Sequence, residues 1–130
     1  MAVVAAKGGG VSYVVIRASA VLTTGYVAAN SISLENVDQL QLWIDFTVGS
    51  SSGCRIKIEY SDDDTTFYQE SYYIRSGNDF QHTVVARSLL ATAKLVISLP
   101  VVAKYLKVSA QAISDGTGTL LAIKAARANL

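Results

Sequence analysis

Apolar and polar residues alternate strictly along three stretches of the chain. In residues 39–48 the even positions are Leu, Ile, Phe or Val, while the odd ones carry mostly polar groups and Trp43. Residues 54–60 and 105–112 repeat the alternation. A period of two is the pattern of a β-strand with one buried face. The chain is therefore predicted to be an all-β protein.

Weaker strand patterns fill the gaps between polar turns. They are expected near residues 12–23, 26–34, 66–74, 80–87, 94–99 and 119–126. Turn-forming residues separate them at 49–53, 61–65, 76–79 and 114–118. About eight short strands with polar turns predict a two-sheet antiparallel β-sandwich of the jelly-roll type. Two alternatives stay open, a short helical turn within 85–94 and an Ala-rich helix within 122–130.

The first ten residues differ from the rest of the chain. Six apolar residues, Val3 and Val4 among them, are followed by Lys7 and a glycine triplet. This composition predicts an extended N-terminal arm on a flexible joint, over residues 1–10, followed by one sandwich domain over 11–130. Val3 and Val4 are candidate contact residues for a neighbouring subunit.

The composition argues against several classes of function. The chain of 130 residues is 51% apolar and 16% charged, so few charges are available for its surface, which favours an assembled protein. A net charge of +1 gives no electrostatic footprint for nucleic acid. No stretch reaches the roughly 20 apolar residues of a membrane helix, and no signal peptide is recognisable. The protein is expected to fold in a reducing host cytoplasm.

The residues that usually carry chemistry are sparse. Cys54 is the only cysteine and His82 the only histidine, and His82 lies in phase with its apolar strand neighbours. The glycines lack a phosphate-loop pattern. The acidic run Asp62, Asp63 and Asp64 is read as a turn, with a calcium site as the open alternative. No catalytic residue, metal site or cofactor is predicted, and the protein is expected not to be an enzyme.

Outward-facing aromatic residues are the candidate contact residues of the domain. Trp43 lies on the polar side of its predicted strand, and Tyr68 shares a strand face with Tyr72. An exposed Trp or Tyr can anchor a protein interface or stack on a sugar. For Trp43, cover by a loop or arm of its own chain is an equal alternative.

Two families resemble parts of this pattern. Residues 43–108 are similar to discoidin-like, galactose-binding jelly rolls, through the segments 43–46, 57–63 with Phe67, and 103–108 after Pro100. Asp64 and Phe67 stand where that family commonly has glycine and tryptophan. The resemblance implies a scaffold, and no sugar-binding residue transfers.

The whole chain resembles small structural proteins of tailed bacteriophages. The shared features are the Tyr-Ser-Asp-Asp turn at 60–63, the Lys-Tyr-Leu-Lys-Val-Ser strand at 104–109, and the hairpin at 115–120. That resemblance implies a virion protein that binds the capsid as cement or decoration, or forms part of the neck or tail. Its expected partners are major capsid or tail proteins and further copies of itself. A carbohydrate-binding adhesion module of the discoidin-like type is the alternative, with a glycan as ligand.

Overall fold

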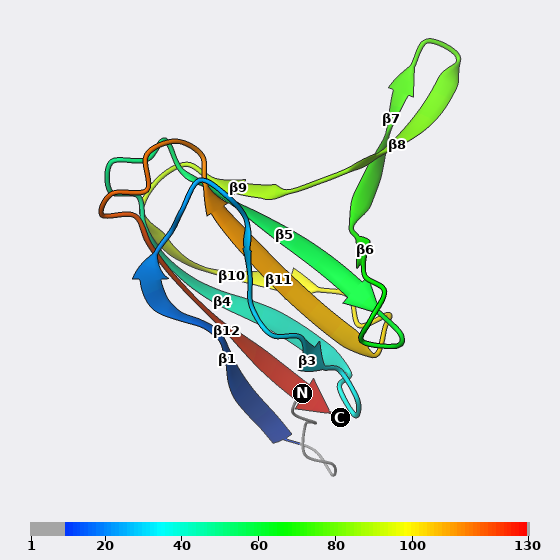
Figure 1. Ribbon diagram of the computed structural model, residues 1–130. Helices are drawn as coiled ribbons and strands as arrows, with labels where there is room; N and C mark the ends of the chain where they lie inside the picture. The colour runs from blue at the N-terminus through cyan, green and yellow to red at the C-terminus, as the bar shows by residue number, and fades with distance from the viewer. Residues whose placement is uncertain (1–9, 130) are drawn as a thin grey trace.

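The computed structural model describes residues 10–129, which form two packed antiparallel sheets and a projecting hairpin (Figure 1). Sheet A has the strand order β1 (Gly10–Val21), β12 (Leu120–Asn129), β4 (Gln39–Thr47) and β10 (Ala93–Leu99). Sheet B is built around β5 (Cys54–Ser61) and β11 (Tyr105–Ala112). The predicted all-β sandwich is confirmed. The strand orders are compatible with a jelly roll, which stays an interpretation.

The two edges of sheet B are made of short pieces. β2 (Val27–Ala28) and β3 (Ile32–Ser33) pair with β11 along one edge. β6 (Tyr68–Gln69) and β9 (Arg87–Leu89) pair with β5 along the other. The hairpin of β7 (Ser71–Ser76) and β8 (Asp79–Val84) is inserted between β6 and β9 and projects away from the sandwich (Figure 1).

The core lies between the sheets, where the alternating residues predicted it. The even-numbered side chains of β4, from Leu40 to Phe46, are all buried, and so are Ile56 and Ile58 of β5. Burying each side chain of this size contributes roughly 1.5–3 kcal/mol. The strict alternation fixes the register, because a slip by one residue would turn the apolar set to solvent.

The helical alternatives are wrong. Residues 87–89 form β9 and 93–99 form β10, while β12 continues as a strand to Asn129. No helix occurs among residues 10–129. Cross-strand pairing holds these segments in the strand conformation: β9 pairs with β5, β10 with β4 and β12 with β1. This pairing outweighs the helical preference of Ala and Leu.

Three expected strands are interrupted. Residues 26–34 contain β2 and β3, residues 66–74 contain β6 and β7, and residues 80–87 contain β8 and the first residue of β9. The interruption at Glu70 has a clear cause, since its backbone N–H donates to the Ile58 carbonyl of β5 while its carbonyl accepts from Val85. Residues before Glu70 therefore belong to the sandwich and residues after it belong to the hairpin.

Candidate binding surfaces

One row of side chains crosses the whole outer face of sheet A. The cross-strand partners Val15, Lys124, Trp43 and Val96 lie side by side on β1, β12, β4 and β10. Val15 is 66% exposed, Val96 49% and Trp43 39%. Three of the four side chains in this row are apolar and exposed, and exposed apolar side chains gathered in one place often mark an interaction surface.

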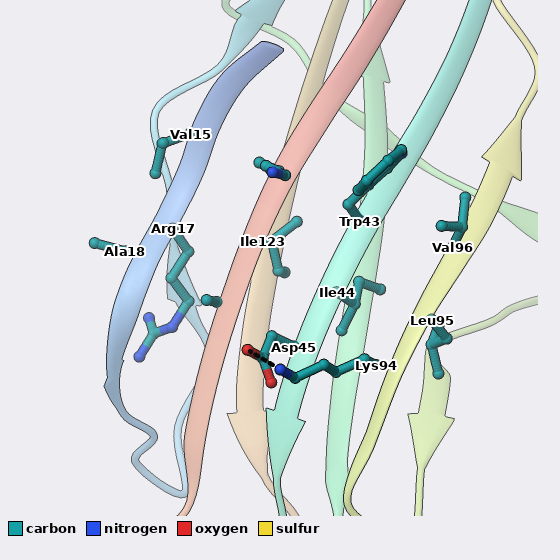
Figure 2. Close-up of a pocket in the computed structure, with 12 residues that line it drawn as sticks. Val15, Arg17, Ala18, Trp43, Ile44, Asp45, Lys94, Leu95, Val96 and Ile123 are labelled. Carbon is teal, nitrogen blue, oxygen red and sulfur yellow. Dashed lines mark ion pairs between the residues drawn. The ribbon is translucent and has the colours of Figure 1, made fainter.

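This row forms part of a groove of about 640 Å³ on the outer face (Figure 2). Its lining residues are Val15, Arg17, Ala18, Trp43, Ile44, Asp45, Lys94, Leu95, Val96, Ala122, Ile123 and Lys124. A hollow of this size lies within the usual range for small-ligand sites. Its lining is largely apolar, with the charged side chains of four residues among it.

Trp43 contacts Lys124 of the row and Tyr13, which lies outside the row. The ring of Tyr13 meets it edge-on, with centroids 5.7 Å apart. The Lys124 ammonium lies 5.2 Å from the Trp43 ring centroid and 5.4 Å from that of Tyr13. An aromatic pair with a shared cation is attractive through the ring quadrupoles. The indole is therefore a fixed, partly exposed plate.

The charged side chains of the groove differ in how strongly neighbouring groups hold them. Lys94 and Asp45 approach to 3.9 Å while both side chains stay largely exposed, so this ion pair contributes little stability. Arg17 instead donates to the backbone carbonyls of Leu121, Ala20 and Val21. A register shift of β1 on either side of Arg17 places it there.

A second hollow, of about 510 Å³, shares Trp43 with the groove. It extends along the outer face of sheet A to Val11 and Tyr13 near the start of β1. On its far side it reaches Ser98 of β10 and Pro100. Trp43 is the lining residue that the two hollows share, so it lies between them on the face of sheet A.

The β7–β8 hairpin is the second surface, and it exposes apolar side chains on both faces. On one face, cross-strand pairing brings together Tyr73 with His82 and Arg75 with Phe80. The Tyr73 ring lies 5.8 Å from Phe80 and 5.7 Å from His82. On the other face Tyr72 and Ile74 are 50% and 43% exposed.

The base of the hairpin is firmly attached to sheet B. Arg87 donates from Nε and a terminal nitrogen to the two carboxylate oxygens of Glu70, at 2.9 and 3.2 Å. The Gln69 amide donates to the Val85 carbonyl at 3.0 Å. Forked arginine–carboxylate pairs fix geometry well. The hairpin tip turns at Gly77, where φ is +62°, which favours glycine.

Of the predicted contact residues, one falls on each surface and a third lies on neither. Trp43 lies in the groove, Tyr72 on the hairpin, and Tyr68, 68% exposed, on β6. Val3 and Val4 lie outside the described residues. Sequence reasoning did not single out Tyr13 or Phe80, whose exposure follows from β1 lying beside β12 and from the hairpin leaving the sandwich. His82 does face the same side as Phe80 and Val84.

The acidic run is a turn. The Asp63 carboxylate accepts from the backbone of Thr65 and Thr66 and from the Ser61 hydroxyl, which lowers its pKa. Asp64, with φ of +62°, accepts from Ser31. Within residues 10–129, no group of three or more His, Cys, Asp or Glu side chains is placed to hold a metal ion.

Cys54 is fully buried in the core, and this burial raises the pKa of its thiol to about 11. A thiol with so high a pKa carries almost no thiolate at neutral pH, and the thiolate is the reactive form. Cys54 is thus a core side chain in this fold. Among the described residues, no helix is long and apolar enough to cross a membrane.

Comparison with known proteins gives a fold and no family. No family model matches the chain, and no curated protein matches its sequence. The chain is similar in structure to the SPBc2 prophage-derived protein YomS, solved by crystallography, with a TM-score of 0.58. The two share 14% identity over 97% of this chain and 99% of that chain. A likeness at this identity shows a common fold, here with a protein of prophage origin.

Proposed function

We propose that this chain is a non-enzymatic structural protein of a bacteriophage particle. It binds capsid or tail proteins and further copies of itself through exposed apolar surface. The observation that carries the proposal is the β7–β8 hairpin, which is rooted by the Glu70–Arg87 pair and exposes Tyr73 and Phe80. The likeness to a prophage-derived fold and the sequence resemblance to phage structural proteins support it.

The hairpin is expected to bind a partner because a hairpin of this kind is poorly stable alone. An isolated two-stranded hairpin is at best marginally stable in water, and usually needs a third strand or a packing surface. Here the side chains of β7 are all exposed, as are those of β8 apart from Thr83. Burying Tyr73 and Phe80 against a partner removes apolar area from water and orders the hairpin.

A paired substitution tests the contact role of the hairpin. Tyr73→Ser with Phe80→Ser removes the aromatic pair, while Gln81→Ser with Thr83→Ser changes two polar side chains of the same hairpin. The first variant should lose self-association in sedimentation velocity and lose incorporation into particles, and the second should keep both. Equal behaviour of the two variants would refute the hairpin contact.

Purified phage particles test the proposal that this chain is a virion protein. Virions released by the organism that carries this gene are purified on a density gradient and probed with an antibody against the recombinant chain. The chain should co-migrate with the particles at a fixed ratio to the major capsid protein. Its absence from intact particles would exclude a virion role.

A carbohydrate-binding module is the second candidate, favoured by the groove around Trp43. The indole plate beside Tyr13, with Asp45 and Lys94 nearby, provides a stacking surface and hydrogen-bonding groups. A glycan array should then give hits that Trp43→Ala abolishes and that the Tyr73→Ser, Phe80→Ser variant keeps. An array without hits would remove this candidate.

A further inference from the structure

We propose that the groove on the outer face of sheet A receives the β7–β8 hairpin of a second copy of this chain. This inference rests on the proposed function, in which the hairpin carries self-association, and it names the surface that the hairpin meets. Each copy then has one hairpin to insert and one groove to fill, so the contact is head-to-tail.

The hairpin of a molecule projects away from that molecule's own groove. It is rooted on sheet B, where the Glu70 N–H donates to the Ile58 carbonyl of β5, and it extends away from the sandwich (Figure 1). The groove lies on the outer face of the other sheet. A hairpin of this kind that occupies the groove therefore comes from a second molecule.

The lining of the groove leaves room for bulky side chains. The small side chains of Ala18 and Ala122 line it, and Ala122 is the cross-strand partner of Asp45. Aromatic side chains are the usual anchors that fill such hollows at protein interfaces. Tyr73 and Phe80 provide two of them on one face of the hairpin, with ring centroids 5.8 Å apart. The hairpin thus carries the type of side chain that the groove can bury.

A two-stranded hairpin also matches the groove in width. The four strands of sheet A span three spacings, about 14 Å, while the two strands of the hairpin are one spacing of about 4.8 Å apart. Laid on the sheet, the hairpin forms a third layer at the separation of packed sheets, about 10 Å. This packing supplies the apolar surface that an isolated hairpin lacks.

One charged group on each surface complements the other. Asp45 is the acidic residue among the lining residues of the groove, and it meets Lys94 only at 3.9 Å with both side chains largely exposed. Arg75 lies on the same hairpin face as Tyr73, and its Nε donates to the Gly77 carbonyl. A guanidinium has five N–H donors, so Arg75 can also bind a carboxylate in the forked geometry.

The other basic groups of the groove are held by their own chain. Arg17 donates to three backbone carbonyls, and the Lys124 ammonium lies against two aromatic rings. The Lys94 side chain is 83% exposed, so it can turn into solvent when an arginine approaches Asp45.

The spacing along the strands gives this contact a register. Arg75 and Tyr73 are two residues apart on β7, as Asp45 and Trp43 are on β4, so each pair projects from one face about 7 Å apart. With Arg75 at Asp45, Tyr73 lies on the Trp43 ring. Phe80, the cross-strand partner of Arg75, then lies over a strand next to β4. The aromatic contact supplies the affinity, and the exposed ion pair contributes little beyond the register.

Two variants that each lose one surface test the contact. Tyr73→Ser with Phe80→Ser removes the aromatic pair of the hairpin, and Trp43→Ser with Asp45→Lys changes the groove. Each variant should be monomeric alone in sedimentation velocity. Mixed in equal amounts, they should form a 1:1 pair that grows no further, because one intact hairpin and one intact groove are left to meet.

Matched variants control for the fold. Gln39→Ser with Gln41→Ser changes the same face of β4 outside the groove and should associate like the wild-type chain. Circular dichroism establishes that the groove variant is folded. If it is not, Ala122→Arg fills the groove while keeping Trp43, and it takes the place of the groove variant in the sedimentation experiment.

Fluorescence follows the same event from within the groove. Trp43 is the only Trp in the chain, so the Trp43→Ser, Asp45→Lys variant has none, and the emission of the mixture comes from the intact groove alone. Titrating this variant into the Tyr73→Ser, Phe80→Ser variant should shift the emission to shorter wavelength and lower the acrylamide quenching constant several-fold. Unchanged emission at saturation would contradict insertion beside Trp43.

A charge exchange tests the register in the same titration. Arg75→Asp in the chain that supplies the hairpin should raise the dissociation constant several-fold. Asp45→Arg in the chain that supplies the groove should bring the constant back toward its original value. Equal constants for all combinations would overturn the placement of Arg75 at Asp45.

The outcomes separate this inference from the hairpin contact itself. A groove variant that associates like the wild-type chain would overturn the inference and leave the hairpin contact standing. A mixture that stays monomeric would overturn it in favour of contact between like surfaces. A wild-type chain that is monomeric at every concentration would also overturn it, while incorporation of the Tyr73→Ser, Phe80→Ser variant into particles still measures the contact with capsid or tail proteins.

Discussion

The Asp63 carboxylate organises the turn after β5 together with the Ser61 hydroxyl, which accepts from the backbone N–H of Asp63 and Asp64. One of the carboxylate oxygens accepts hydrogen bonds from the backbone of Thr65 at 2.9 Å and Thr66 at 2.8 Å, and from Ser61 Oγ at 3.0 Å. Asp favours turns for this reason. The three hydrogen bonds to this oxygen explain why Asp63 is found in a turn, which is the reading that the sequence favoured over a calcium site.

Acid should weaken this turn. The pKa of Asp63 is lowered in the folded protein by its hydrogen bonds, so the stabilisation is present above the carboxyl's ordinary pKa and is lost as the pH falls through the folded value. Asp63→Asn should therefore reduce the drop in the urea midpoint between pH 7 and pH 3. Asp62→Asn, which removes an exposed neighbour outside these hydrogen bonds, is the control. A drop in Asp63→Asn as large as in the wild-type protein would contradict the assignment.

Gly116 is predicted to be intolerant of any side chain. A Cβ at this position would lie 2.0 Å from the Leu22 carbonyl oxygen, which is a backbone atom and cannot rotate away. Gly116→Ala should cost about 1–3 kcal/mol of unfolding free energy, through strain of the kind that overpacking causes. Gly25→Ala is the control, since nothing lies within 4 Å of its Cβ position. Equal urea midpoints for the two variants would show that the loop at 116 yields freely.

At the scale of elements, the long strands were predictable, including β1 and β10 at the edges of sheet A, and the short pieces at the edges of sheet B were not. β4 is paired on both sides and buried on one face, so its side chains alternate and reveal it. β9 pairs on one side only, and its three residues carry too short a pattern to separate from a helical turn. The groove could be anticipated only through Trp43, because its other walls depend on which strands become neighbours.

The hairpin should be the least protected element in hydrogen exchange. β7 and β8 pair only with each other, so their amides can open without disturbing the sandwich. In the monomeric Tyr73→Ser, Phe80→Ser variant they should exchange far faster than the amides of β4, measured by mass spectrometry. If the proposed hairpin contact forms between copies of the chain, protection of β7 and β8 in the wild-type protein should rise with concentration. Protection in the monomer equal to that of β4 would show that the hairpin is stable alone.

At the scale of the whole molecule, apolar surface lies in two separate places. The groove occupies the outer face of sheet A. The hairpin extends from an edge of sheet B (Figure 1). Two different surfaces on one chain permit a head-to-tail contact, which closes into a ring when the rotation between subunits allows it. The exposed apolar side chains of both surfaces thus lie away from the core that holds the fold.

Salt should have little effect on the association of this protein. The chain carries 11 basic and 10 acidic residues, for a net charge of +1, so neither long-range attraction nor repulsion between copies is strong. The proposed contacts through Tyr73 and Phe80 would rely on removing apolar area from water, which ions do not screen. The sedimentation coefficient at fixed protein concentration should thus change little as NaCl is raised from about 0.05 to 0.5 M, where the Debye length falls severalfold. Dissociation at the higher salt would mean that Arg75, Asp79 or other charges hold the subunits together.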